Sequence, residues 1–163
     1  MKFSEFQFHP ALQSTLDSIG FSECTPVQSQ TIPAVLEGKD VAGLAQTGTG
    51  KTAAFLLPLM ERILRAQDAK KAGVTISPPR LESTEGEVGE PVAVAESEAG
   101  HSSEFARGFP DWAPMNFILV LVPTRELAEQ VYENAVKFGS GAGLRAVSIY
   151  GGVAYDKQKD ALR

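Results

Sequence analysis

The octapeptide at residues 45–52, Ala-Gln-Thr-Gly-Thr-Gly-Lys-Thr, constrains the fold more than any other part of this chain. It follows residues 40–44, whose apolar run is typical of a buried strand, and it precedes an apolar segment that can continue as a helix. A glycine loop between a strand and a helix is the context in which Gly-Lys-Thr binds phosphate. The pattern therefore predicts an α/β fold with a phosphate-binding loop.

The residues of such a loop have separate roles. Gly48 and Gly50 allow the tight turn that points backbone N–H groups at phosphate oxygens. A helix that opens at about Lys51 adds the positive end of its dipole. Lys51 is expected to reach the β- and γ-phosphates, and the Thr52 hydroxyl to bind Mg²⁺. The alternative is a glycine turn followed by a solvated lysine.

A second set of candidate residues lies upstream of the loop. Phe3 is followed by residues 20–28, Gly-Phe-Ser-Glu-Cys-Thr-Pro-Val-Gln. The Gln28 amide can pair with N6 and N7 of adenine but can satisfy only one of the two guanine acceptors. Phe21 offers a flat face on which a base can stack. Core packing of the phenylalanines and a surface position for the glutamine are the alternatives.

Helix signals lie between and after these residues. Residues 10–19 predict a short helix that ends at Gly20 and would place Phe3 and Phe21 at its opposite ends. Thr25 and the proline after it are typical of a second helix start, since a hydroxyl caps the N-terminus and proline suits the first turn.

Two further motifs occur in the second half of the chain. Residues 117–122 form an apolar run typical of a strand buried on both faces, and Thr124 can cap the helix that follows. The N–H groups at that helix start, together with Arg125, form an anion site. Residues 146–150 predict a third strand ending at Gly151 and Gly152, which allow close approach to a phosphate. A capped helix with a surface Arg–Glu pair and a plain glycine turn are the alternatives.

Together these motifs resemble the DEAD-box family of RNA helicases. That family has an isolated aromatic residue and a Gly-aromatic, Thr-Pro-x-Gln run before its loop, and the loop begins with alanine, as at Ala45. It also has Pro-Thr-Arg-Glu-Leu and a Gly-Gly pair, followed by a glutamine and an apolar residue at the places of Gln158 and Leu162. The matches extend over residues 3–162 in the family's order, with one long break in the middle.

The resemblance implies an α/β fold with a parallel sheet flanked by helices, the P-loop NTPase or RecA-like domain, incomplete at its C-terminal end. Residues 1–40 would form an adenine-reading helical segment, and residues 41–163 a partial RecA-like ATP-binding domain. The implied activity is that of an ATP-dependent RNA helicase, an RNA-stimulated ATPase that unwinds duplexes or remodels ribonucleoproteins. ATP and Mg²⁺ are the implied cofactors.

The resemblance also assigns roles to individual residues. ATP is expected at the adenine-reading residues and the loop, namely Phe3, Phe21, Thr25, Gln28, Ala45, Gln46, Thr47, Gly48, Thr49, Gly50, Lys51 and Thr52. Lys51 and Thr52 are the candidate catalytic residues, and Thr52 is also the candidate metal ligand. The RNA backbone is expected at Pro123, Thr124, Arg125, Gly151 and Gly152, without readout of base identity. Protein partners are not indicated.

Two other interpretations remain open. A GTPase or small-molecule kinase would share the loop, but a GTPase needs a guanine-reading Asn-Lys-x-Asp sequence, which this chain lacks. A non-catalytic module would hold ATP or RNA and turn over neither. It is favoured by the absence of Asp-Glu-Ala-Asp and by the polar surroundings of Asp156 and Asp160, since neither aspartate ends an apolar strand.

Composition supports a single domain and points to one unusual segment. A length of 163 residues with 43% apolar residues suits one α/β domain, although the net charge of −5 is acidic for an RNA-binding protein. Residues 81–104 hold seven glutamates and no lysine or arginine, so the rest of the chain carries a charge of +2. Residues 67–113 are therefore expected to be a disordered acidic insertion, either without a specific role or autoinhibitory or partner-binding.

Other features predict where the protein is found. There is no run of eighteen apolar residues and no apolar signal-peptide core, so neither a membrane span nor secretion is expected. The single cysteine, Cys24, suits a reducing compartment. His9 and His101 are expected at the surface, since no cysteine lies at metal-binding spacing from them. These features predict a cytoplasmic protein.

Overall fold

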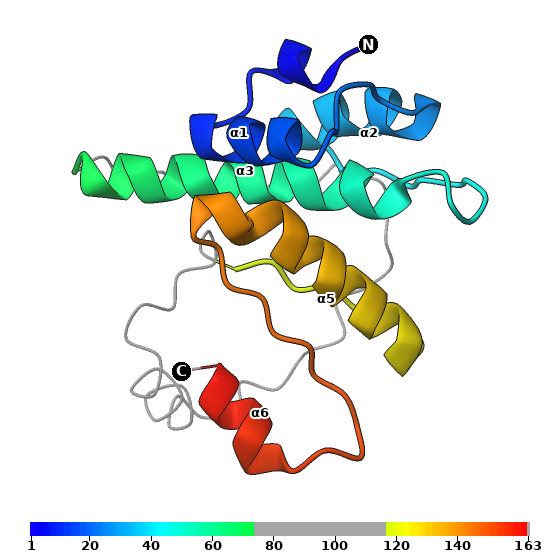
Figure 1. The fold of residues 1–163 in the computed structure, drawn as a ribbon, viewed down its shortest axis with the longest axis vertical. Helices are drawn as coiled ribbons and strands as arrows, with labels where there is room; N and C mark the ends of the chain where they lie inside the picture. Colours follow the sequence, from blue (N-terminus) through cyan, green and yellow to red (C-terminus); the bar gives the residue numbers. More distant parts are fainter. Residues whose placement is uncertain (74–116, 163) are drawn as a thin grey trace, which may run out of the picture.

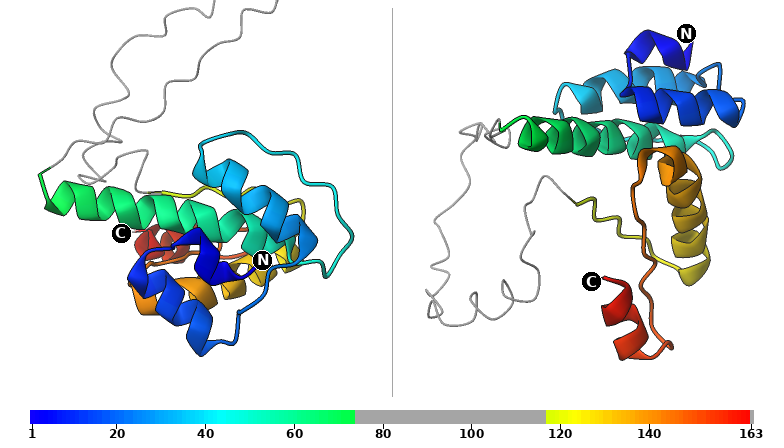
Figure 2. Two further views of the ribbon diagram at one scale, coloured as in Figure 1. Left: turned by 90° about the horizontal axis from the view of Figure 1, so that it is seen from above. Right: turned by 60° about the vertical axis from the view of Figure 1, so that its left-hand side comes forward.

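The computed structural model describes residues 1–73 and 117–162. Seven helical elements occur in this part of the chain: η1 (Phe3–Phe6), α1 (Pro10–Ser18), α2 (Pro26–Leu36), α3 (Lys51–Lys71), α5 (Arg125–Gly139), η3 (Ser140–Ala142) and α6 (Tyr155–Ala161). Figure 1 shows α3 across the middle, with α1 and α2 on one side of it and α5 on the other. Figure 1 and the right view of Figure 2 show α6 away from α3, beyond a long extended segment. No helix among the described residues is long and apolar enough to cross a membrane.

The central helix α3 is buried because its apolar residues are spread around most of its circumference. Leu56, Leu57 and Leu64 are each at most 4% exposed, and Met60 and Ile63 are also buried. A helix with apolar residues on several faces must pack against neighbours on more than one side. The packing of α2 and α5 on different sides of α3 meets this requirement.

The N-terminal layer is closed by backbone pairing. The Phe3 amide donates to Ser22 O at 3.1 Å, and the Cys24 amide donates to Met1 O at 3.0 Å. This antiparallel pairing brings the start of the chain back to the segment after α1. The predicted helix over residues 10–19 is confirmed, since α1 covers Pro10–Ser18 and is followed by Gly20 with φ 75°.

The same pairing corrects the expected placement of two phenylalanines. Phe3 and Phe21 do not lie at opposite ends of α1, because their ring centroids are only 5.7 Å apart. Since residues 1–3 lie beside residues 22–24, the two rings meet on one side of the helix. The helix length alone could not indicate this return of the chain.

The helix after Thr124 begins as predicted. The Thr124 hydroxyl accepts a hydrogen bond from the Leu127 amide at 3.3 Å, which caps α5. Val131, Ala135 and Phe138 of α5 contact the core, and Phe138 is only 1% exposed. Leu127, in the first turn of the same helix, is 40% exposed.

The three predicted strands are not formed as strands within residues 1–73 and 117–162. Residues 40–44, 117–122 and 146–150 are extended or irregular in the described chain and form neither helices nor regular strands. Residues 40–44 are also exposed, and Leu44 is fully so. The expected burial of residues 40–44 is therefore wrong for this structure. Ladder bonds and burial come from neighbouring strands, which a segment's own composition does not supply.

Residues 117–122 are buried on one face instead of two. Ile118 and Val120 pack against the core, whereas Leu119 and Leu121 are 83% and 84% exposed. This alternation is the side-chain pattern of an extended chain. A cavity of about 1140 Å³ lies between this segment, the segment at residues 143–151, and helices α3 and α5. The helices cover the inner face, and nothing in the described chain covers the outer one.

The boundary predicted for the acidic insertion also changes. Residues 67–71 were assigned to the insertion, but they are the last residues of α3. Lys70 and Lys71 lie in the last turn, where positive charge interacts well with the helix dipole, and Gly73 follows with φ 74°. Residues 74–113 of the predicted insertion lie outside the described residues.

If α3 is the centre of the core, shortening one of its buried leucines should be costly. Leu57→Ala should lower the free energy of unfolding by about 2–5 kcal/mol, because Leu57 is 0% exposed and its removal leaves a cavity. The measurement is urea unfolding followed by circular dichroism. Leu119→Ala is the matched control and should cost about 0.5 kcal/mol or less, because its side chain is in solvent. Equal costs for the two variants would contradict this placement of the core.

Candidate nucleotide and RNA-backbone sites

The phosphate loop lies at the N-terminal end of α3 (Figure 1). Gly48 and Gly50 have φ values of 82° and 87°, in the left-handed region that glycine adopts without strain. The Thr49 hydroxyl donates to Gln46 O at 2.8 Å and closes the turn. The first residue of α3 is Lys51, as predicted from the sequence. Unpaired N–H groups at this helix start provide donors for an anion.

The Lys51 side chain is held across the loop. Its ammonium donates to the backbone oxygen of Gln46 at 2.6 Å and also to that of Ala45. The lysine is therefore part of the loop, and the alternative of a solvated lysine after a glycine turn does not describe this structure. Thr52 is the second residue of α3 and is partly exposed beside it.

The adenine-reading segment is hydrogen-bonded directly to the phosphate loop. The Thr25 hydroxyl donates to Thr49 O at 2.9 Å, and Gln28 Nε2 donates to Gly50 O at 3.2 Å. Gln28 Oε1 accepts from the Thr25 amide at 2.9 Å, which also caps α2. Gln28 is only 3% exposed, so it is not a surface amide. Each end of an amide has capacity for one further hydrogen bond, so these contacts do not exhaust the side chain.

Gly50 is required at its position for two independent reasons. Its φ of 87° disfavours any residue with a β-carbon, and a β-carbon there would lie 2.3 Å from Gln28 Nε2. Gly48 has the same type of φ but no atom within 4 Å of the equivalent position. Of these two loop glycines, only Gly50 has Gln28 close to the position that a β-carbon would take.

The two phenylalanines occupy different depths. Phe21 is partly exposed, packs against Phe138 with ring centroids 5.4 Å apart, and has the Lys137 ammonium 5.5 Å from its ring centre. Phe3 is 1% exposed and lies behind Phe21. Phe21 is therefore the more accessible of the two rings, and Phe3 contacts it from the buried side. Lys137 had no sequence signal that linked it to this site.

The residues predicted to bind the RNA backbone come together from two segments. The Arg125 guanidinium lies 4.3 Å from the centre of the Tyr150 ring, next to Gly151 and Gly152. Arg125 thus contacts an aromatic ring instead of acting only as the partner of a surface glutamate. The Glu126 carboxyl, next to Arg125, accepts a hydrogen bond from the Glu126 backbone N–H, and this bond lowers the pKa of the carboxyl. A hydrogen bond with the Thr124 side chain lowers the same pKa.

Gln158 holds the glycine turn in place. Its Oε1 accepts from the Tyr150 amide at 3.0 Å, and its Nε2 donates to Tyr150 O at 3.2 Å and Val153 O at 3.3 Å. Gly152, inside this turn, has φ 85°. The only sequence signal for Gln158 was its spacing from the glycine pair.

Comparison with known proteins identifies relatives of this chain. The sequence model of the DEAD/DEAH box helicase family matches residues 25–163. The "ATP-dependent RNA helicase RhlB" of Xanthomonas oryzae pv. oryzae is 42% identical over 161 residues, which cover 99% of this chain and 21% of that protein. The "DEAD-box ATP-dependent RNA helicase CshA" of Streptococcus pneumoniae is 37% identical over 163 residues, 100% of this chain and 22% of that protein.

A solved structure shows the same relationship. The RNA helicase Prp28 from Chaetomium thermophilum, bound to ADP, aligns with a TM-score of 0.62 and 28% identity, covering 99% of this chain and 29% of that chain. This match and the family match confirm the predicted α/β fold class. The chain spans about a fifth of the length of these two curated relatives. Because the family model covers most of its residues, this chain belongs to the DEAD/DEAH box helicase family.

Proposed function

We propose that this chain is the ATP-binding and RNA-backbone-binding part of an ATP-dependent RNA helicase. The observation that carries the proposal is the pair of hydrogen bonds from Thr25 and Gln28 to Thr49 and Gly50. They join the adenine-reading segment to the phosphate loop. The two segments can therefore bind the base and the phosphates of the same nucleotide. The relatives named above, which are ATP-dependent RNA helicases, support the same activity.

The residues present fit ATP and Mg²⁺. Gly48 and Gly50 form a left-handed turn at a helix N-terminus, which suits phosphate, and Thr52 offers a hydroxyl one residue into the helix, which suits Mg²⁺. Mg²⁺ supplies positive charge that offsets the charge of the phosphates when it is bound. Lys51 would exchange its bonds to Ala45 O and Gln46 O for bonds to phosphate oxygens. Phe21 would face the base.

RNA would be held through its backbone. A guanidinium stacked on a ring keeps its in-plane N–H donors available, so Arg125 can lie on Tyr150 and still bind a phosphate. The capped start of α5 adds backbone N–H donors, and Gly151 and Gly152 leave room for close approach. Duplex unwinding and ribonucleoprotein remodelling are the proposed outcomes of this contact.

The cytoplasmic location stays a prediction.

A second candidate concerns the 163 residues taken alone. They supply groups for binding nucleotide, but neither Asp156 nor Asp160 lies near the phosphate loop in sequence or at the end of a strand. We therefore propose that these residues by themselves bind ATP without turning it over. The longer relatives have room for the remaining catalytic groups.

The base site should select adenine. Gln28→Ala should weaken ATP binding and narrow the difference between ATP and GTP, because the amide that pairs with adenine is lost. Phe21→Ala should weaken both nucleotides, since base stacking is worth about 1–3 kcal/mol. Calorimetric titration with each nucleotide measures these effects, with Gln30→Ala, an exposed glutamine of α2, as the control. Equal affinity of the unmutated chain for ATP and GTP would sink this prediction.

RNA affinity should depend on phosphate contacts. In a longer chain that includes the second helicase domain, Arg125→Ala should weaken binding about equally across RNA sequences and reduce the salt dependence by about one counterion. Fluorescence anisotropy at several salt concentrations provides the measurement. Arg145→Ala is the control, because Arg145 is not among the residues predicted to bind the RNA backbone. A loss confined to particular RNA sequences would indicate base readout instead.

The 163 residues alone should not hydrolyse ATP at a useful rate. Phosphoryl transfer needs a carboxylate for the metal, a group that orients water and positive charge on the leaving side, and an arginine supplied in trans is worth about 10³–10⁵ in rate. The test is steady-state phosphate release with saturating RNA, beside a chain extended through the second domain. RNA-stimulated turnover by the short chain that disappears in Lys51→Ala would show that the catalytic residues are misplaced here.

A further inference from the structure

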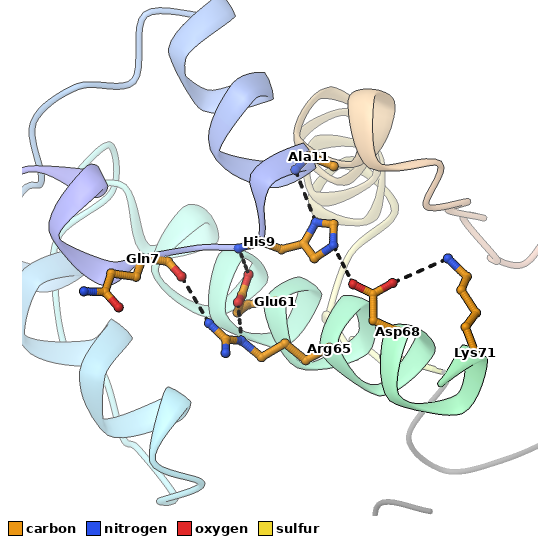
Figure 3. A network of polar contacts seen from close by, with 7 residues as sticks. All are labelled: Gln7, His9, Ala11, Glu61, Arg65, Asp68 and Lys71. Carbon is orange, nitrogen blue, oxygen red and sulfur yellow. Dashed lines mark hydrogen bonds and ion pairs between the residues drawn. The ribbon is translucent and has the colours of Figure 1, made fainter. Parts of the chain in front are cut away.

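A buried carboxylate anchors the N-terminal segment to the central helix (Figure 3). Glu61 of α3 is 1% exposed and accepts a hydrogen bond from the His9 amide at 2.6 Å. Its other oxygen accepts from Arg65 Nε at 2.5 Å, and Arg65 Nη2 donates to Gln7 O at 3.1 Å. A buried carboxylate is tolerated only with such partners. Glu61 and Arg65 thus grip the backbone on both sides of residue 8.

The His9 side chain adds an outer contact to this anchor. Its Nδ1 accepts from the Ala11 amide at 3.2 Å, so a neutral His9 carries its proton on Nε2 and donates it to Asp68 at 2.9 Å. Figure 3 shows Glu61, Arg65 and Asp68 along one side of α3, facing residues 7–9. His9 was expected at the surface, but its side chain is partly buried and contacts α3 through Asp68.

The gripped segment has a backbone that needs support. Gln7 has φ 53° and ψ 48°, and among the described residues it is the only non-glycine with positive φ. A left-handed non-glycine residue is costly and persists where surrounding contacts fix it. The hydrogen bonds of Glu61 and Arg65 to the neighbouring backbone provide that fixation.

An unbroken set of aromatic contacts connects the anchor to the predicted base site. Phe8, between the two gripped positions, lies 5.5 Å from Phe6, measured between ring centroids. Phe6 lies 6.4 Å from Phe3, and Phe3 lies 5.7 Å from Phe21. The backbone pairing of residues 1–3 with residues 22–24 runs beside these rings. The ring that would face a base is therefore supported from the Glu61 anchor.

We propose that Glu61 and Arg65 are positioning residues for nucleotide binding. By fixing residues 7–9 on α3, they set the position of Phe21 relative to a phosphate loop that begins the same helix. The proposal rests on the proposed ATP site. Glu61 would thus have a role in base binding although it lies eleven residues after Gly50 and contacts His9 instead of the phosphate loop.

The test separates base binding from phosphate binding. Glu61→Gln retains the shape of the side chain but has one acceptor oxygen, so it cannot satisfy both His9 N–H and Arg65. Arg65→Gln removes the guanidinium from a side chain that is 63% exposed and endangers folding less. Glu133→Gln, on an exposed position of α5, is the matched control. Each chain is titrated with Mg²⁺ and either ATP or inorganic triphosphate, which carries the phosphates without the base.

Both anchor variants should weaken ATP binding by about three- to tenfold, in the range seen for substitutions that act at a distance. Triphosphate binding should stay within about twofold, because the loop itself is intact, and Glu133→Gln should change neither. In the nucleotide-free chain, hydrogen exchange at the Phe3 and Cys24 amides should be faster in the anchor variants, since these amides pair residues 1–3 with residues 22–24.

Each remaining outcome counts against the proposal. Unchanged ATP affinity in a folded Arg65→Gln variant, or equal losses of ATP and triphosphate, would show that the anchor is structural only, while the proposed function would stand. If Glu61→Gln does not fold, Arg65→Gln decides. Failure of the unmutated chain to bind ATP at all would remove the proposed function and this inference with it.

Discussion

The burial of α3 between two layers is the constraint on which the rest of the structure depends. Each face of this helix holds something that matters to the sites: α2 and its glutamine near the first turn, the N-terminal segment near Glu61, and α5 on the opposite side. The phosphate loop is the start of the same helix. One rigid helix, α3, therefore sets the positions of the loop, the adenine-reading segment and the start of the RNA-backbone site. Close packing of its buried leucines holds α3 in place.

The features that the sequence predicted well are those determined within a few residues. Thr124 caps α5, Gly20 ends α1, and α3 begins at Lys51, because capping and glycine conformation depend on local chemistry. The order of the motifs was equally informative, since several short matches at the expected places indicated the family that the comparison then established. Local chemistry and motif order were sufficient for the fold class and the family.

Tertiary contacts account for what the sequence did not predict. Gln28 is turned toward Gly50, and Phe3 lies behind Phe21, because the chain returns on itself in a way that no periodicity encodes. His9 appeared to be a surface residue since its partner, Asp68, is fifty-nine positions away. The helix after the loop is longer than its apolar pattern, because its last turn is stabilised by charge instead of burial. The exposure of residues 40–44 and of the outer face of residues 117–122 was also not predicted, because burial depends on neighbouring segments.

The exposed outer face of residues 117–122 makes this polypeptide prone to aggregation. Phe-Ile-Leu-Val-Leu-Val is uncharged, rich in β-branched residues and free of proline, and alternate side chains project into water. Short apolar segments of this kind can stack with identical segments from other chains when their side chains are exposed. Aggregation of these 163 residues is then expected to depend on protein concentration as much as on temperature. A charged residue in place of Leu119 or Leu121, where the side chain contacts little, is the simplest change that would improve their handling.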